Sequence, residues 1–189
     1  MINILLGFVF VFFKPNLSFL DIGVVYYLTN IIGYISIFFG VKELARKYQG
    51  VIKVQPYVIF MVCHSIIFFL LNATGNSPLT IAMSSYMAVI SLVGLGFIIV
   101  GMFMVFVIIS HLIDALKDET SESFNTRRLE TFVATMMTTF ALAATCYFVI
   151  PMLPEIAEIL MGVLLFLKII FLIEFYIVFL RNKERIVEQ

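Results

Sequence analysis

The sequence predicts an all-α protein: a single integral membrane domain, residues 1–189, built as a polytopic bundle of transmembrane helices. Hydrophobic residues make up 62% of the chain and charged residues 13%, whereas soluble domains are roughly half apolar and about a quarter charged. The mean hydropathy is +1.11, and five apolar runs reach the roughly 20 residues that a spanning helix needs. The 12 basic and 12 acidic residues balance, so no excess positive charge would attract a nucleic acid. The composition excludes a soluble domain, a disordered tail and a nucleic-acid binder.

The first apolar segment, near residues 2–13, is too short for an ordinary span. At about 1.5 Å per residue it reaches only roughly 20 Å. Lys14-Pro15-Asn16 ends it, because proline cannot continue the hydrogen-bond ladder and asparagine favours turns. The segment is either a short span or a re-entrant half-helix, and we expect the short span.

Five full spans follow, and their boundaries can be read from polar turns and prolines. The predicted segments lie near residues 20–41, 56–72, 79–110, 130–150 and 155–180. Pro56, Pro154 and the pair Ser77-Pro78 mark helix starts, since proline suits the first helical position. The turns at 72–78 and 151–154 are short, so we expect consecutive helices to be antiparallel neighbours.

The basic residues predict the orientation in the membrane. Ten of the 12 basic residues fall on one side: Lys42, Arg46, Lys47, Lys53, Lys117, Arg127, Arg128, Arg181, Lys183 and Arg185. Basic loops stay in the cytoplasm. We therefore expect cytoplasmic loops at 42–55 and 111–129, a cytoplasmic tail at 181–189 and a multi-pass protein of the plasma membrane.

Small and hydroxylated residues recur at helical spacing in two spans. One stripe, predicted to pack helices together, contains Ser84, Ser91, Gly94 and Gly101. The other contains Thr131, Thr135, Thr138 and Thr145. Small residues let helices approach closely in lipid, and hydroxyls bond across helices. The threonine face has three interpretations: helix packing, a polar groove for a solute, or hydroxyls bonded silently to their own backbone.

Three ionisable residues inside the spans are the candidate ligand-binding residues, together with Thr131, Thr135 and Thr138. Lys168 lies halfway along the last apolar segment, Glu174 lies six residues later, and His64 lies within the 56–72 segment. Ionisable groups in a bilayer are costly and are functional candidates by default. A six-residue offset puts Lys168 and Glu174 on different helix faces, so each needs a partner elsewhere or water. The hydroxyls of Tyr26 and Tyr86 are candidate partners for Lys168.

Metal, haem and catalytic motifs are weak or missing. His111, Asp114 and Asp118 have a spacing that could bind a metal, but a polar helix end is usually just solvated. Two histidines at different depths do not suit a haem. We find no nucleophile elbow, zincin helix or phosphate-binding glycine loop. The sequence therefore predicts no cofactor and no catalytic residue, and the absence of these motifs argues against an enzyme.

The N-terminal quarter carries a familiar pattern. Asp21-Ile-Gly-Val-Val is followed by an Ile-Gly-Tyr-x2-Ile-x2-Gly-x3-Leu element at 32–44. This part resembles small uncharacterised multi-spanning membrane proteins of Gram-positive bacteria. The resemblance implies a bacterial plasma membrane and no known activity. In size the chain is also similar to the substrate-capture subunits of energy-coupling-factor transporters, but its first two segments lack their Ala-xxx-Ala face.

These observations leave three functional hypotheses. The first is a transport or permease-type component with a polar site at mid-membrane around Lys168. The alternative is a non-enzymatic accessory, regulatory or immunity membrane protein that acts through a protein partner, docking on the loop at 42–55, the loop at 114–130 or a lipid-facing groove. The third is a membrane enzyme acting on lipid or prenyl substrates at His111, Asp114 and Asp118. The expected partners are the lipid bilayer and either a membrane protein or further copies of the chain.

Overall fold

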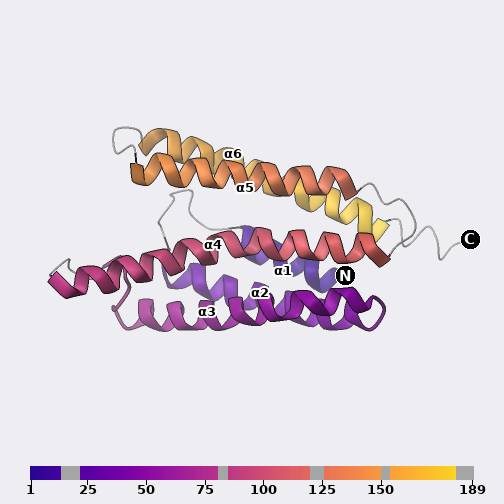
Figure 1. Ribbon diagram of the computed structural model, residues 1–189, viewed down its shortest axis with the longest axis horizontal. Helices are drawn as coiled ribbons and strands as arrows, with labels where there is room; N and C mark the ends of the chain where they lie inside the picture. Colours follow the sequence, from indigo (N-terminus) through magenta and orange to yellow (C-terminus); the bar gives the residue numbers. More distant parts are fainter. Residues whose placement is uncertain (14–21, 81–84, 120–125, 150–153, 182–189) are drawn as a thin grey trace, which may run out of the picture.

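The computed structural model describes residues 1–13, 22–80, 85–119, 126–149 and 154–181. These residues form helices and turns, with no strand among them. The order along the chain is α1 (Ile2–Phe12), α2 (Val24–Ala45), the 3₁₀ helix η1 (Gln49–Val54), α3 (Gln55–Ala73), α4 (Ser85–Glu119), α5 (Thr126–Val149), α6 (Pro154–Tyr176) and the π-helical turn η2 (Ile177–Arg181). Figure 1 shows the helices lying side by side along the long axis. The prediction of an all-α bundle is confirmed.

Five of the described helices are long and apolar enough to cross a membrane. They give apolar stretches of 22 residues in α2, 25 in η1 and α3, 31 in α4, 23 in α5 and 25 in α6 and η2. Helix α1 is apolar but has only 11 residues. The chain is therefore a small multi-pass integral membrane protein.

The helix ends differ from the predicted segment ends. Helix α2 continues to Ala45 instead of residue 41, and α4 covers Ser85–Glu119 instead of 79–110. Lys, Glu, Leu and Ala favour helix, so the hydrogen-bond ladder continues where hydropathy falls. The predicted loops at 42–55 and 111–129 consist largely of helix ends and η1. At 77–80 the chain makes a turn, with the Thr80 N–H donating to the Ser77 carbonyl at 2.9 Å, so the expected helix start at residue 79 is wrong.

Helices α1 and α2 pack at very close range because glycines face each other. A Cβ added to Gly7 would lie 2.6 Å from the Gly33 carbonyl oxygen, and one added to Gly33 would lie 2.8 Å from the Gly7 carbonyl oxygen. One turn earlier in α1, the Ile4 nitrogen would lie 2.8 Å from a Cβ on Gly40 of α2. Only glycine allows backbones this close, and small residues commonly mediate such contacts in membranes.

Hydrogen bonds fix the direction in which α1 packs on α2. The Ser36 hydroxyl donates to the Asn3 carbonyl at 2.7 Å, and the Asn3 amide donates to Glu43 at 3.5 Å, so the start of α1 lies beside the end of α2. Helix α1 ends at Phe12, after about 16 Å, roughly half of a 30 Å hydrocarbon core. The chain then reaches the opposite end of α2 at Val24. Helix α1 therefore runs antiparallel to α2, and the expectation that it is a short span stays a prediction.

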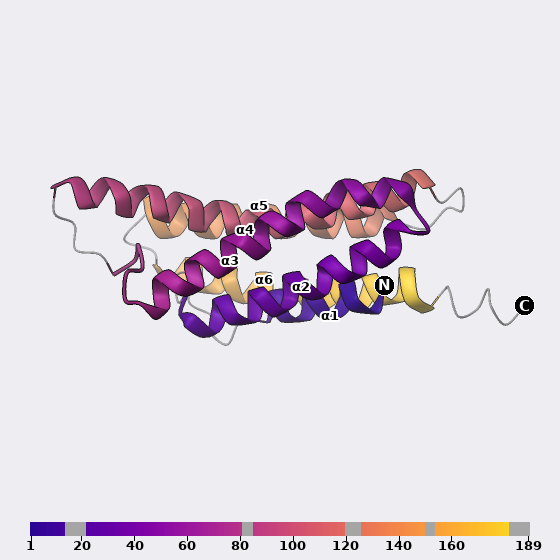
Figure 2. The same ribbon diagram turned by 90° about the horizontal axis from the view of Figure 1, so that it is seen from below.

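The helices close into a ring. Each helix contacts the next in the order α1, α2, α3, α4, α5, α6, and α6 returns to contact α1. Figures 1 and 2 show the hairpin of α5 and α6 facing α1 to α4. Aromatic side chains form the contact between α1 and α6. Phe8 of α1 meets Phe171 and Phe175 of α6 edge-on, with centroid distances of 6.3 and 5.7 Å. Such edge-to-face contacts are favourable for aromatic pairs.

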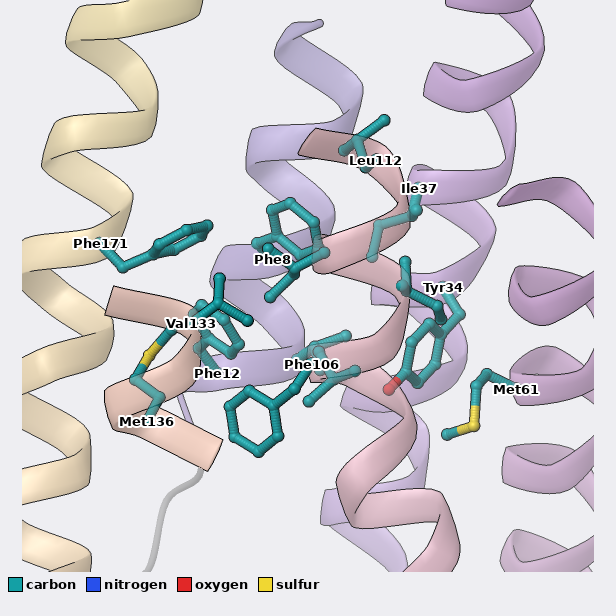
Figure 3. Packing of buried hydrophobic residues seen from close by; sticks show 14 of the residues in the cluster. Phe8, Phe12, Tyr34, Ile37, Met61, Phe106, Leu112, Val133, Met136 and Phe171 are labelled. Atoms are coloured by element: carbon teal, nitrogen blue, oxygen red, sulfur yellow. The ribbon is translucent and has the colours of Figure 1, made fainter. Parts of the chain in front are cut away.

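The centre of the bundle is filled by apolar side chains from the surrounding helices. Figure 3 shows Phe12, Phe106 and Phe171 turned inward from three different helices, with Tyr34 reaching in from α2. All four are almost completely buried. The outer faces carry large apolar side chains that are exposed in the isolated chain, as expected for a surface that meets lipid.

Candidate polar site in the middle of the bundle

Lys168 is the one charged side chain in the bundle core among the described residues. It lies one residue past the centre of the 25-residue span Glu155–Phe179 and is only 7% exposed. Helix α6 directs it inward, because it lines one cavity together with residues of α1, α2, α4 and α5. A charged group at this depth is costly in a bilayer, so its surroundings must stabilise it.

The end of α1 provides part of that stabilisation. The Lys168 ammonium nitrogen lies 5.4 Å from the centre of the Phe12 ring, within the range of cation–π attraction. Phe12 is the last residue of α1, and Phe13 is already extended. A helix C-terminus carries about half a negative charge from its unpaired carbonyl groups. A helix that stops halfway through the bundle therefore presents its negative end near a buried cation.

A small cavity lies next to Lys168. Its volume is about 20 Å³, and its lining comes from α1, α2, α4, α5 and α6. The polar side chains in the lining are Lys168, Tyr26 and Tyr34. A site needs about 10–15 Å³ to hold a water molecule, so this cavity accommodates one water and no larger solute. Tyr26, an expected partner of Lys168, shares this cavity with it, whereas the side chain of Tyr86 lies outside the described residues.

Glu174 lies apart from this cavity. Its carboxylate is 3.9 Å from the guanidinium of Arg128 on α5, and its side chain is 25% exposed against 69% for Arg128. Lys117 and Glu130 form a second ion pair of 2.8 Å between α4 and α5. Both pairs join neighbouring helices at the end of the bundle where the basic residues collect. As the spacing predicted, Glu174 finds its partner on another helix.

His64 of α3 contacts α4 at Phe97 and Gly101. Its Nε2 lies 3.0 Å from the Phe97 carbonyl oxygen, and a Cβ added to Gly101 would collide with the imidazole ring. Gly101 itself lines the Lys168 cavity. A carbonyl only accepts, so Nε2 carries the proton in this bond and Nδ1 of the neutral ring is an acceptor. Gly101 therefore both contacts His64 and lines the cavity that holds Lys168.

The threonines of α5 do not reach the site. The hydroxyls of Thr131, Thr135 and Thr138 donate to the carbonyls four residues earlier at 2.8, 2.8 and 2.9 Å, and all three side chains are exposed. The residue of α5 that lines the cavity is Phe140. At 3.6 residues per turn, each threonine lies roughly 140–200° around the helix from Phe140. Of the three interpretations of this stripe, the geometry matches hydroxyls bonded to their own backbone.

The predicted packing stripe on α4 contacts α3 and the turn before α4. Ser91 donates to the Pro78 carbonyl, and a Cβ on Gly94 would lie 2.5 Å from the Pro78 ring. Gly101 meets His64, as described above. Ser84 lies outside the described residues.

The candidate metal residues stay at the end of α4. The His111 ring stacks on Tyr57 with centroids 4.9 Å apart, and the Asp114 side chain is exposed. The side chain of Asp118 lies outside the described residues. Within the part of the chain that the structure describes, no group of three or more His, Cys, Asp or Glu side chains could hold a metal ion.

Several residues of the site escape sequence analysis. Tyr34 and Phe12 resemble ordinary apolar positions, and nothing in the sequence places them next to Lys168. Asn30 could have been found, because it is an amide inside an apolar span, and it is 4% exposed. No protein-family model, curated protein or solved structure matches this chain, so the site is interpreted from its own geometry.

Proposed function

We propose that this protein is a transport or permease-type component that moves a small anionic solute, with Lys168 as the solute-attracting charge. The observation that carries the proposal is the burial of Lys168 at mid-membrane, beside a cavity lined by five of the helices. The end of α1 offsets about half an elementary charge. Lys168 itself supplies a positive charge beside the cavity, and a positive charge attracts an anion and repels a cation.

Movement of helices is part of this proposal. The cavity of about 20 Å³ admits only water, so a solute requires the ring to open. Helices α5 and α6 form one closely packed hairpin and meet the other helices through α4 and α1. Because α6 carries Lys168, displacement of this hairpin would widen the cavity and move the charge together.

The remaining assignments belong to the same proposal. The basic helix ends are proposed to face the cytoplasm, which puts the C-terminus inside. The plasma membrane of a bacterium is the proposed location, supported by the resemblance of residues 21–44. Of the predicted ligand residues, Lys168 is the one that lines the cavity. Glu174 pairs with Arg128, the hydroxyls of Thr131, Thr135 and Thr138 bond to their own helix, and His64 bonds to α4, so these residues take no part in the proposed solute site.

The test measures thermal unfolding of the purified full chain in mild detergent with sodium chloride, phosphate, acetate or citrate. We expect at least one anion to raise the melting temperature of the unaltered protein, Lys168→Met to abolish that shift, and Lys168→Arg to retain it. Glu174→Gln is the matched control, because it removes a charge from the same helix outside the cavity. A melting temperature insensitive to every anion, or equal shifts in Lys168→Met, would contradict the proposal.

A second function, that of an accessory subunit, is favoured by the first turns of α4. Helix α4 has 35 residues and is about 52 Å long, and Figures 1 and 2 show its start extending past the neighbouring helices. Val89, Leu92 and Val93 there are 62%, 66% and 54% exposed. A projecting apolar helix end suits a membrane protein partner.

Purification from the native host in mild detergent, with mass spectrometry of co-eluting proteins, tests the accessory function. We expect a stoichiometric partner that is lost in Leu92→Asn and kept in Ile159→Asn, since Leu92 and Ile159 are equally exposed at 66%. Recovery of the chain alone or as a homo-oligomer would contradict a role as an accessory subunit. A transporter ATPase or scaffold as the partner would unite it with the transport proposal.

A further inference from the structure

The interface between α2 and α3 contains a second group of buried polar atoms, separate from Lys168. Four side-chain atoms in the described part of the chain are buried without a hydrogen-bond partner in the protein: Tyr27 Oη, Asn30 Oδ1, His64 Nδ1 and Ser65 Oγ. Tyr27, Asn30 and Ser65 are 1%, 4% and 0% exposed, and His64 is 9% exposed. Unpaired buried polar atoms are rare in folded proteins and each one requires an explanation.

The four atoms belong to one layer of the bundle. The Tyr27 ring stacks on Phe68 of α3 at 5.7 Å, and the His64 ring lies 4.6 Å from the same phenylalanine. Asn30 follows Tyr27 by three residues, and Ser65 precedes Phe68 by three. Because α2 and α3 run antiparallel, Asn30 and Ser65 lie on the same side of the Tyr27–Phe68 contact.

The unpaired atoms share one chemistry, since all four can accept a hydrogen bond. Asn30 Oδ1 and His64 Nδ1 are acceptors only, because His64 Nε2 carries the ring proton. The hydroxyls of Tyr27 and Ser65 can both donate and accept. Ser65 also differs from the threonines of α5, whose hydroxyls bond to their own helix. The site therefore suits a small molecule that donates to some of these atoms and accepts from others.

Charge distinguishes water from a cation at this site. Helix α3 has no acidic residue, and α2 has none before Glu43, so no carboxylate would balance a buried cation. Lys168 beyond Gly101 would repel it. A buried charge without a partner is strongly unfavourable, whereas a neutral water usually makes about three bonds to buried polar groups.

We infer that the α2–α3 interface binds ordered water, held by Tyr27, Asn30, His64 and Ser65, and that this water extends the polar lining of the Lys168 cavity into α3. The connection passes through Asn30, which is buried one helical turn after Tyr26 on the same side of α2. Tyr26 in turn lines the cavity beside Lys168. The result is a hydrated polar seam from α6 to α3 within a membrane bundle. The inference does not depend on the transport proposal, because Lys168→Met tests that proposal and leaves these four residues unchanged.

The inference is tested by whether Ser65→Ala lowers or raises the melting temperature. If water bonds to Ser65, Ser65→Ala removes a hydrogen bond and lowers the melting temperature. If the site is dry, the same change removes an unpaired buried hydroxyl and raises it. Ser110→Ala is the matched control, because Ser110 is exposed on α4 and reports the ordinary effect of exchanging serine for alanine in a helix. A melting temperature of Ser65→Ala at or above that of Ser110→Ala would overturn the inference.

A second measurement uses the unaltered protein and so avoids any folding defect of the variant. Brief X-ray radiolysis in ¹⁸O-labelled water oxidises side chains beside bound water, and mass spectrometry locates the label. We expect Phe68, which contacts both Tyr27 and His64, to be labelled several-fold faster than Phe175. Both phenylalanines are buried, and Phe175 lies in the aromatic contact between α1 and α6. Equal labelling of the two would show that the site is dry.

Discussion

Replacement of Gly7 by alanine is the sharpest test of the close packing between α1 and α2. The added Cβ would lie 2.6 Å from the Gly33 carbonyl oxygen and 2.9 Å from the Ile37 nitrogen. Both neighbours are backbone atoms, so rotation of the Ile37 side chain, which is also in contact, cannot relieve the clash. An ordinary contact of this kind starts near 3.4 Å, and the two helices must therefore separate by several tenths of an ångström.

The expected loss in the free energy of unfolding of Gly7→Ala follows from that displacement of the helices. Overpacking of a well-packed contact costs about 1–3 kcal/mol, and a gap of about 0.5–1 Å forfeits a quarter to a half of the dispersion energy of the surrounding atoms. Exchanging glycine for alanine in a helix gains about 1 kcal/mol in the opposite direction. Gly96→Ala on α4 isolates this gain, because a Cβ on Gly96 meets nothing within 4 Å.

The two variants are compared by reversible unfolding in mixed micelles with increasing SDS, followed by circular dichroism. We expect the free energy of unfolding of Gly7→Ala to lie about 1–3 kcal/mol below that of Gly96→Ala. If the two variants were equally stable, the α1–α2 crossing would be wider than the structure shows. The argument that glycine positions α1 against α2, and hence Phe12 against Lys168, would then fail.

Three further substitutions should change the free energy of unfolding by amounts that the structure allows us to state. Ser36→Ala removes the 2.7 Å hydrogen bond to the Asn3 carbonyl and should lower the free energy of unfolding by about 0.6–2 kcal/mol; no loss in SDS titration would mean that the bond is not formed. Thr135→Val removes a hydroxyl bonded within its own exposed helix face, so stability should change by no more than about 0.5 kcal/mol, and a larger loss would reveal an interhelical partner. Arg128→Gln breaks the 3.9 Å pair with Glu174, and because Arg128 is largely exposed, the loss should stay below about 1 kcal/mol and shrink as salt is added; a loss independent of salt would argue for a buried pair.

Features that depend on one helix at a time could be predicted from the sequence. The five spans, the shared end of the basic residues and the mid-membrane depth of Lys168 all follow from hydropathy, charge and the rise of a helix. The ends of α2 and α4 were harder to predict from the sequence. Hydropathy locates the membrane boundary, and these helices continue beyond it in residues that favour helix.

The neighbours of Lys168 could not be predicted in the same way. Phe12, Tyr26 and Tyr34 lie more than 130 residues before it in the chain, and their meeting depends on the register between α1, α2 and α6. The threonines of α5 could be predicted only in part. Their spacing correctly predicted that they share one helix face, but it did not show that this face turns away from the cavity.

The sequence by itself determined that this chain is a helical membrane protein with a lysine in the middle of its last span. The tertiary structure decided which helices surround that lysine, that α1 stops beside it, and that Asn30, His64 and Ser65 are buried in one layer. The physical reason lies in the solvent. Lipid makes every apolar helix face equally acceptable, so the choice of partner depends on close packing of glycines, aromatic contacts and a few hydrogen bonds, which a linear pattern does not record.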